Sequence, residues 1–176
     1  MKTIITLGGS SSSESINKKF AEYAGSLIQH AEIINLDLND YEIPLYSIDE
    51  ENASGFPEDL KRLDQQIAET DGIILSLAEH NGAYTAAFKN AFDWLSRIEA
   101  KTWRNKPMLL LSTSPGARGG QSVRAMALDR FPRHSANIVF SMSFPSFNDN
   151  FQMGEVVDPE LKAELEKGIR LLQETI

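Results

Sequence analysis

The sequence predicts an α/β protein built on a doubly wound parallel sheet of five strands in the order 2-1-3-4-5. Short apolar runs alternate with amphipathic stretches from end to end of the 176 residues, with no internal repeat and no dividing linker. Parallel strands buried on both faces read as continuous apolar runs, and the helices that cover them carry one apolar stripe. Right-handed crossovers then make one sheet with helices on both faces the most economical arrangement. We therefore expect residues 1–176 to form a single domain.

Each element has its own signal in the chain. The apolar runs predict strands over Thr3–Leu7, Glu32–Leu36, Gly72–Leu77, Pro107–Ser112 and Asn137–Phe140. Spacings of three or four predict helices that carry Ile16, Phe20, Ala24, Leu27 and Ile28, then Leu60, Leu63 and Ile67, then Tyr84, Ala87, Phe88, Ala91, Phe92 and Leu95. A fourth helix is expected over Gln121–Asp129. The last begins with Asp158 as N-cap and Pro159 in its first turn, and carries Leu161, Leu165, Ile169 and Leu172.

Composition excludes several classes of protein. The chain has 17 Lys and Arg against 25 Asp and Glu, a net charge of −8, and no cysteine, which excludes disulfide scaffolds, thiolate zinc sites and cysteine nucleophiles. An acidic chain is a poor ligand for nucleic acid. No apolar run approaches the roughly 20 residues of a membrane span, and Met1–Gly9 turns to glycine too soon for a signal peptide. We expect a cytoplasmic protein without nucleic-acid or membrane partners.

The segment Gly8–Asn17 follows the first strand and leads into the first helix. Ligands of such sheets bind beyond the carboxyl ends of the strands, where the winding direction switches. Glycines, serine hydroxyls and the free N–H groups of a helix N-terminus together suit a phosphate. The segment has neither Gly-Lys-Ser/Thr nor G-x-G-x-x-G. The alternative is a serine-rich turn in which Ser13 or Ser15 only caps the helix.

Two further loops fall at the same edge. Leu77–Tyr84 contains Glu-His-Asn-Gly, whose Asn81-Gly82 pair predicts a tight turn with positive φ. Ser112–Ser122 contains three glycines, so its backbone approaches a neighbour closely or bends sharply. Each loop alone reads equally as a plain strand-to-helix connection. Three of them at one rim favour a ligand site.

Five segments carry a family resemblance. Gly9–Asn17 fits Gly-Ser-x-Arg-x-x-Ser-x-Asn, Asp37–Tyr46 fits Asp-Leu-x-Asp-x-x-x-Pro-Leu-Tyr, and Ala78–Gly82 fits Pro-Glu-Tyr-Asn-Gly. Phe88–Ser96 fits Leu-Lys-Asn-Ala-x-Asp-Trp-Leu-Ser, and Gly116–Gly120 fits Gly-x-x-Gly-Gly. Over roughly Ile4 to Phe140 the chain resembles the NADPH-dependent FMN reductases, flavodoxin-like proteins that include azo-dye, quinone and chromate reductases.

The resemblance implies a site and an activity. Ser10, Ser15 and Asn17 would hold the FMN phosphate, Glu79 to Gly82 would border the isoalloxazine, and Ser112, Ser114 and Gly116 would lie along its pyrimidine side. The implied cofactor-binding residues are Ser10, Ser12, Ser15, Ile16, Asn17, Glu79, His80, Asn81, Gly82, Ser112, Ser114, Gly116 and Gly119. Hydride would pass from NADPH or NADH to flavin and then to a small acceptor such as a flavin, quinone, azo compound or metal oxyanion, with no protein acid or base required. A homodimer or dimer of dimers is implied as well.

The chain departs from the family pattern at Ser12, Ala78 and His80, which replace arginine, proline and tyrosine. Ser12 removes a cation from the phosphate region, and Arg118 is a candidate replacement. Three histidines show no metal-ligand spacing, so no metal site is expected.

Two other functions compete with the reductase. A flavodoxin-like electron carrier without nicotinamide activity is the alternative, although flavodoxins carry a Thr-x-Thr-Gly-x-Thr type loop. A serine hydrolase using Ser10 and His80 lacks a Gly-x-Ser-x-Gly elbow and an orienting Asp.

Two surface features complete the expectations. Trp94 lies off the apolar stripe of its helix, which makes it a candidate for a self-association surface. The acidic stretch Asp49–Glu51 is expected to be a solvated loop.

Overall fold

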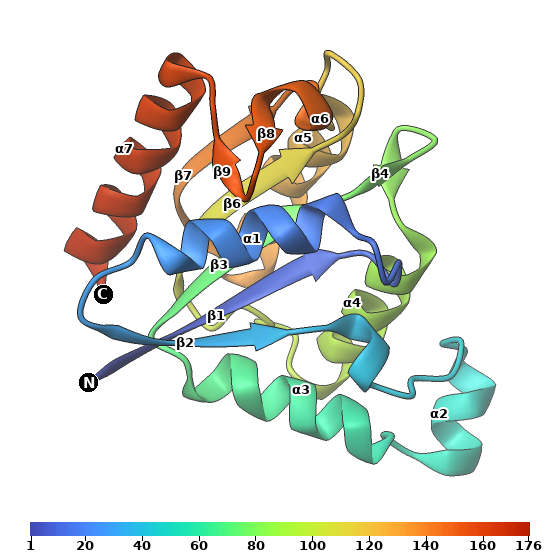
Figure 1. The fold of residues 1–176 in the computed structure, drawn as a ribbon. Coiled ribbons are helices and arrows are strands. Elements are labelled where there is room, and N and C mark those ends of the chain that lie inside the picture. Colours follow the sequence, from blue (N-terminus) through green and yellow to red (C-terminus); the bar gives the residue numbers. More distant parts are fainter.

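A parallel sheet of five strands forms the centre of the computed structural model, which describes residues 1–176 (Figure 1). Its strands are β1 (Lys2–Gly9), β2 (Ala31–Leu36), β3 (Gly72–Leu77), β6 (Pro107–Thr113) and β7 (Asn137–Phe144). They lie in the order β2-β1-β3-β6-β7, and every pairing is parallel. In chain order these are strands one to five of the sheet, so the predicted order 2-1-3-4-5 is confirmed.

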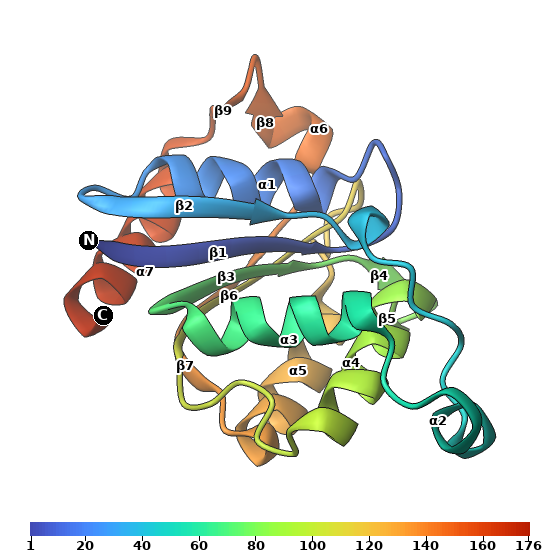
Figure 2. The same ribbon diagram turned by 90° about the horizontal axis from the view of Figure 1, so that it is seen from below.

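Helices cover both faces of the sheet. On one face lie α1 (Ile16–Ser26) and α7 (Pro159–Thr175), and on the other lie α3 (Glu58–Glu69), α4 (Ala86–Ile98) and α5 (Gln121–Arg130) (Figure 2). Because successive strand residues point to opposite faces, Ile4 and Ile74 pack toward α1 and α7 while Ile5, Ile73 and Leu75 pack toward α3 to α5. The two cores are therefore separated by the sheet. No helix combines the length and the apolar character needed to cross a membrane.

The predicted boundaries fail where polar residues interrupt an apolar run. β7 continues past Phe140 to Phe144 because Met142 and Phe144, which alternate with Ser141 and Ser143, are buried. Short elements carry too little periodicity to be predicted: two 3-10 turns (Leu38–Asp40 and Phe131–His134), α2 (Ile48–Ser54), the hairpin of β4 (Glu79–His80) with β5 (Ala83–Tyr84), α6 (Phe147–Asn150), and the hairpin of β8 (Phe151–Gln152) with β9 (Glu155–Val156).

The acidic stretch expected to be a loop is helical. Asp49–Glu51 form the first turn of α2, where Ser47 caps the helix by accepting a hydrogen bond from the Glu50 N–H at 3.0 Å. Carboxylates stabilise this end of a helix because they face its positive dipole. Glu51 also binds Arg97 of α4 at 2.8 Å, so α2 is fastened to the body of the protein.

Trp94 does not form a surface, and the expectation that it would was wrong. Its side chain has no exposed area, and its indole Nε1 donates to the Pro44 carbonyl oxygen at 2.8 Å. Tyr46 and Phe56 pack edge-on against its ring. The segment that contains α2 folds over this side of α4 and buries a residue that the helix pattern alone leaves outside.

Candidate functional site

The loops after β1, β3 and β6 meet at the carboxyl edge of the sheet and enclose a cavity of about 260 Å³. Its lining consists of Ser10, Ser12, Glu14, Ser15, Ile16, Asn17, Ala78, Glu79, His80, Thr113, Ser114 and Pro115. Eight of the residues predicted to bind the cofactor are among them: Ser10, Ser12, Ser15, Ile16, Asn17, Glu79, His80 and Ser114. The prediction that one rim gathers all three loops is confirmed.

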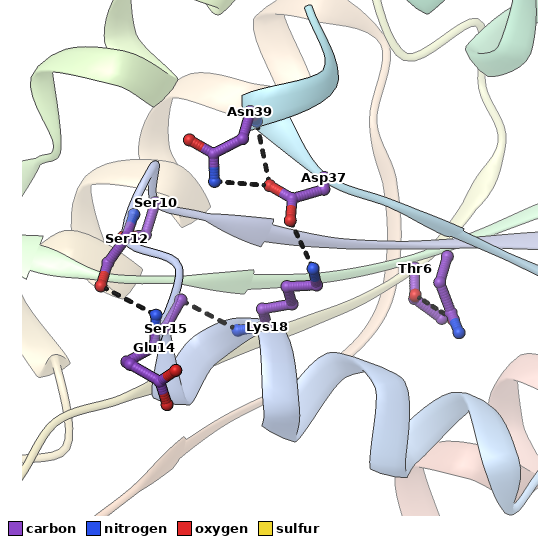
Figure 3. Close-up of polar contacts among 9 residues, drawn as sticks. Thr6, Ser10, Ser12, Glu14, Ser15, Lys18, Asp37 and Asn39 are labelled. Atoms are coloured by element: carbon purple, nitrogen blue, oxygen red, sulfur yellow. Dashed lines mark hydrogen bonds and ion pairs between the residues drawn. The ribbon is translucent and has the colours of Figure 1, made fainter.

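The segment Gly8–Asn17, called the serine loop below, approaches α1 closely at its first residue. A Cβ on Gly8 would lie 2.6 Å from the Lys18 backbone nitrogen, so only glycine lets the end of β1 pack against the helix. Ser15 is the N-cap of α1, accepting from the Lys18 N–H at 3.1 Å, which decides between the two predicted caps (Figure 3).

Three serine hydroxyls that line the cavity accept hydrogen bonds from the backbone. Ser10 Oγ accepts from the Ser12 N–H at 3.1 Å, and Ser12 Oγ accepts from the Glu14 N–H at 3.2 Å, as Ser15 Oγ does from Lys18. Since each oxygen already accepts a bond from the backbone, each hydroxyl proton remains to be donated. The N–H groups of Ile16 and Asn17, at the start of α1, add the unpaired donors of a helix N-terminus.

Asn17 ties three elements together through a buried side chain. Its Oδ1 accepts from the Ser76 hydroxyl of β3 at 2.7 Å and from the Thr113 N–H of β6 at 3.0 Å, while its Nδ2 donates to the Thr113 carbonyl oxygen at 3.1 Å. The side-chain amide thus continues the hydrogen bonding of β6 as a neighbouring strand would. Most of its bonding capacity goes to holding α1 against the sheet, and its backbone N–H remains as a donor toward the cavity.

The β4–β5 hairpin forms one wall of the cavity. Asn81 (φ 52°) and Gly82 (φ 75°) make the predicted tight turn with positive φ, but they lie at its tip outside the lining. Glu79 and His80 line the cavity. Glu79 Oε2 also accepts from the Val123 N–H at 2.9 Å, in the first turn of α5. That helix begins at Gly120, which has no side chain to cap it, so the carboxylate supplies the missing acceptor.

Three residues predicted to bind the cofactor, Ser112, Gly116 and Gly119, hold the third loop in place and do not line the cavity. Ser112 is fully buried and donates to the Gly119 carbonyl oxygen at 2.8 Å. A Cβ on Gly119 would lie 2.6 Å from the Phe144 backbone, and the Gly116 carbonyl accepts from the Ser146 N–H at 2.9 Å. The cavity is lined instead by Ser114 and its neighbours, Thr113 and Pro115. Thr113 and Pro115 were not among the predicted binding residues. The feature of the sequence that could have pointed to them is their position on either side of Ser114.

Cations near the serine loop are paired outside the cavity. Lys18 forms an ion pair with Asp37, which raises the pKa of the lysine (Figure 3). Burial opposes ionisation of Asp37, but the bonds from Lys18 and the Asn39 N–H bring the pKa of that carboxyl below its usual value. Arg118 donates to the Ser122 hydroxyl at 3.2 Å and does not line the cavity. It therefore does not occupy the place of the family arginine that Ser12 replaces.

Ser10 and His80 both line the cavity, yet no hydrogen bond joins them. A serine nucleophile needs a base within hydrogen-bonding reach and a third group to orient it. The hydrolase alternative therefore has no geometric basis here.

A sequence model of the family described as NADPH-dependent FMN reductase matches residues 2–149. The chain belongs to the NADPH-dependent FMN reductase family. Three of the five segments that carry the resemblance, Gly9–Asn17, Ala78–Gly82 and Gly116–Gly120, lie in the loops after β1, β3 and β6.

Similar proteins include several reductases. A quinone reductase of Escherichia coli is 32% identical over 117 residues, which are 66% of this chain and 62% of that protein, so the match spans somewhat less than two thirds of the relative. An NAD(P)H-dependent FMN reductase of Pseudomonas aeruginosa is 27% identical over 97% of this chain and 92% of its own. The solved structure of a flavoenzyme NAD(P)H:(acceptor) oxidoreductase from Paracoccus denitrificans has the same fold, with a TM-score of 0.77, 24% identity and 99% of both chains covered.

Proposed function

We propose that this member of the family is an FMN-dependent NAD(P)H oxidoreductase that reduces a small acceptor such as a quinone. The observation that carries the proposal is the convergence of three serine hydroxyls and the N-terminus of α1 on one cavity at the switch point of the sheet. This donor set fits a phosphate monoester. Similarity to proteins named as quinone reductases and as an FMN reductase supports the acceptor class and the cofactor.

The residues of the cavity divide into two groups. Ser10, Ser12 and Ser15 would donate their hydroxyl protons to the phosphate, together with the N–H groups of Ile16 and Asn17. Glu79, His80 and Ser114 would form the walls beside the ring. These residues would hold FMN, which would supply the hydride and electron chemistry between the nicotinamide and the acceptor.

The protein's own contribution is binding and orientation. No side chain has to act as a general acid or base, because the reacting atoms belong to cofactor and substrates. Asn17 fixes the start of α1 to β3 and β6, and Glu79 fixes the β4–β5 hairpin to the start of α5. Rigid loops of this kind would raise the rate of electron transfer by holding the nicotinamide and then the electron acceptor at the same position.

An absorption spectrum of the isolated protein, followed by FMN titration and anaerobic addition of NADPH and of NADH, tests the proposal. We expect quenched flavin fluorescence on binding, bleaching of bound flavin by at least one nicotinamide, and its reoxidation by a quinone. Binding without bleaching by either nicotinamide would favour the electron carrier. Absence of flavin binding would overturn both functions.

Assembly and location are part of the same proposal. We infer a homodimer or a dimer of dimers from the family resemblance, and sedimentation at micromolar concentration that detects only monomer would refute it. A cytoplasmic location follows from the proposed use of NAD(P)H as electron donor, and fractionation of the producing cells would test it.

A further inference from the structure

No lysine or arginine lines the cavity. Its twelve residues include two carboxylates, those of Glu14 and Glu79, and one histidine, His80. The carboxylate of Glu79 is turned to the Val123 N–H at the start of α5, where a helix terminus offsets its charge. Glu14 has no such partner in the lining.

Glu14 stands at the rim of the donor set. Its backbone N–H bonds the Ser12 hydroxyl, and it immediately precedes the cap residue Ser15. Its side chain is 83% exposed and binds Lys19 at 2.9 Å, and this bond lowers the pKa of the carboxyl, so the group is ionised at neutral pH. Lys19 lies outside the lining and offsets the charge only in part.

The other cations of this region lie outside the lining. Lys18 forms an ion pair with Asp37, and Arg118 donates a hydrogen bond to Ser122. The whole chain is acidic as well, with a net charge of −8. A phosphate monoester near neutral pH carries a charge of about −1.5 to −2. At this cavity it would meet neutral donors, a helix dipole and a repelling carboxylate.

We propose that the phosphate subsite is electrically neutral in its donors and that Glu14 is a specificity-determining residue, which lowers affinity for phosphate-bearing flavin and so keeps the flavin exchangeable. This inference rests on the proposed function, because it concerns the same cavity. It departs from a subsite built on an arginine, in which attraction between opposite charges holds the phosphate.

The two kinds of subsite respond to salt in opposite ways. Attraction to a cation weakens as salt screens it, whereas repulsion from Glu14 and the acidic surface is relieved by the same screening. We therefore expect affinity of the apoprotein for FMN to stay constant or rise as salt is increased to about 1 M, where the Debye length is about 3 Å. Riboflavin, which lacks the phosphate, should bind with an affinity that salt does not change.

Variants separate Glu14 from general charge effects. At low salt Glu14→Gln should tighten FMN binding about twofold to fivefold, a range typical of one exposed charge, and leave riboflavin unchanged. Glu174→Gln is the matched control: it removes an equal charge from the end of α7, near the amino edge of the sheet and away from the cavity. At high salt the difference between Glu14→Gln and wild type should vanish.

Ser12→Arg restores the cation in the family position. It should tighten FMN binding about tenfold or more through a charge-assisted bond, leave riboflavin unchanged and make FMN binding weaken with salt. All titrations follow flavin fluorescence with apoprotein, and circular dichroism checks that each variant is folded.

The outcomes distinguish this inference from the function it rests on. If neither flavin binds the wild type, the proposed function is wrong and the inference falls with it. If FMN binds but weakens steeply with salt, or if Glu14→Gln behaves like Glu174→Gln, the neutral subsite is wrong while the proposed function stands.

Discussion

At the scale of single residues, Asn17 holds the site together from beneath. It is 2% exposed and makes three hydrogen bonds to groups that are themselves buried, on Ser76 and Thr113. Family resemblance implies that it contacts the phosphate, but its side chain is occupied by the sheet. Its importance for the cavity is therefore mainly to hold the first turn of α1 in register with β3 and β6.

Replacing Asn17 should act mainly on the free energy of unfolding. Asn17→Ala leaves the Ser76 hydroxyl and both backbone groups of Thr113 without partners, and we expect a loss of about 3 kcal/mol in the free energy of unfolding. Urea denaturation of the apoprotein measures it. Asn52→Ala, at an exposed position of α2 where the side chain makes no hydrogen bond, is the control and should change little. A loss below about 0.5 kcal/mol for Asn17→Ala would show that water or a rearranged loop satisfies these groups.

Ser15 has two roles that one substitution can separate. Ser15→Ala removes the cap of α1, which costs about 1 kcal/mol of stability, and it removes a hydroxyl donor to the proposed phosphate, which costs about 1.5–3 kcal/mol of FMN binding. Ser47→Ala removes an equivalent cap from α2 away from the cavity and should lower stability without changing FMN affinity. Calorimetric titration and thermal unfolding give both quantities. Equal FMN affinity in Ser15→Ala and wild type would remove Ser15 from the site.

At the scale of elements, the hairpin that walls the cavity depends on a helix far along the chain. Glu79 of β4 caps the start of α5 at Val123, 44 residues away, because Gly120 leaves that helix without a side-chain cap. The hairpin itself is only two residue pairs long, and isolated hairpins of this size are marginal in water. Its position beside the serine loop is therefore set by tertiary contact.

Shortening Glu79 should loosen this contact. Glu79→Ala removes the acceptor of the Val123 N–H and should lower the free energy of unfolding by about 1 kcal/mol, whereas Glu79→Gln keeps an acceptor oxygen and should lose less. Hydrogen exchange at the amide of Val123 reports the bond directly and should speed up most in Glu79→Ala. Equal exchange in both variants and the wild type would contradict a capping role.

The limits of sequence reading also lie at this scale. Strands such as Gly72–Leu77 were predictable to the residue because an unbroken apolar run has one stable place, the centre of a parallel sheet. The burial of Trp94 was not predictable because it depends on Pro44 and Tyr46 folding over α4 from a distant segment. Likewise the side-chain roles of Ser112 and Glu79 depend on partners in other elements. Local motifs located the cavity, and only the assembled loops decided which side chains face it.

At the scale of the whole molecule, carboxylates tie the acidic chain together. Asp71 accepts from the Thr3 N–H and Lys2, Asp59 from Arg62 and the Glu42 N–H, and these contacts hold the pKa of each carboxyl below its usual value. The bond from Arg97 does the same for the pKa of Glu51, against the opposing effect of burial. Apart from the Asp59–Arg62 pair, which lies within α3, these contacts join segments distant in sequence and link β1 to the start of β3, the loop after β2 to α3, and α2 to α4.

These contacts predict how stability depends on pH. A carboxyl whose pKa is lower in the folded state stabilises that state above its unfolded pKa of about 4, and the contribution is lost as pH falls through the lower folded pKa. We expect the free energy of unfolding to change little between about pH 7 and 5 and to fall as the pH drops below about 4. Asp71→Asn removes one group that takes up a proton on unfolding, so its stability should fall less steeply. Glu164→Gln, which removes an exposed carboxylate in the interior of α7 that has no hydrogen-bond or ion-pair partner, is the control and should follow the wild type. Urea denaturation at a series of pH values measures the slope, and stability that rises through this acid range would show that relief of the −8 net charge outweighs the loss of these contacts.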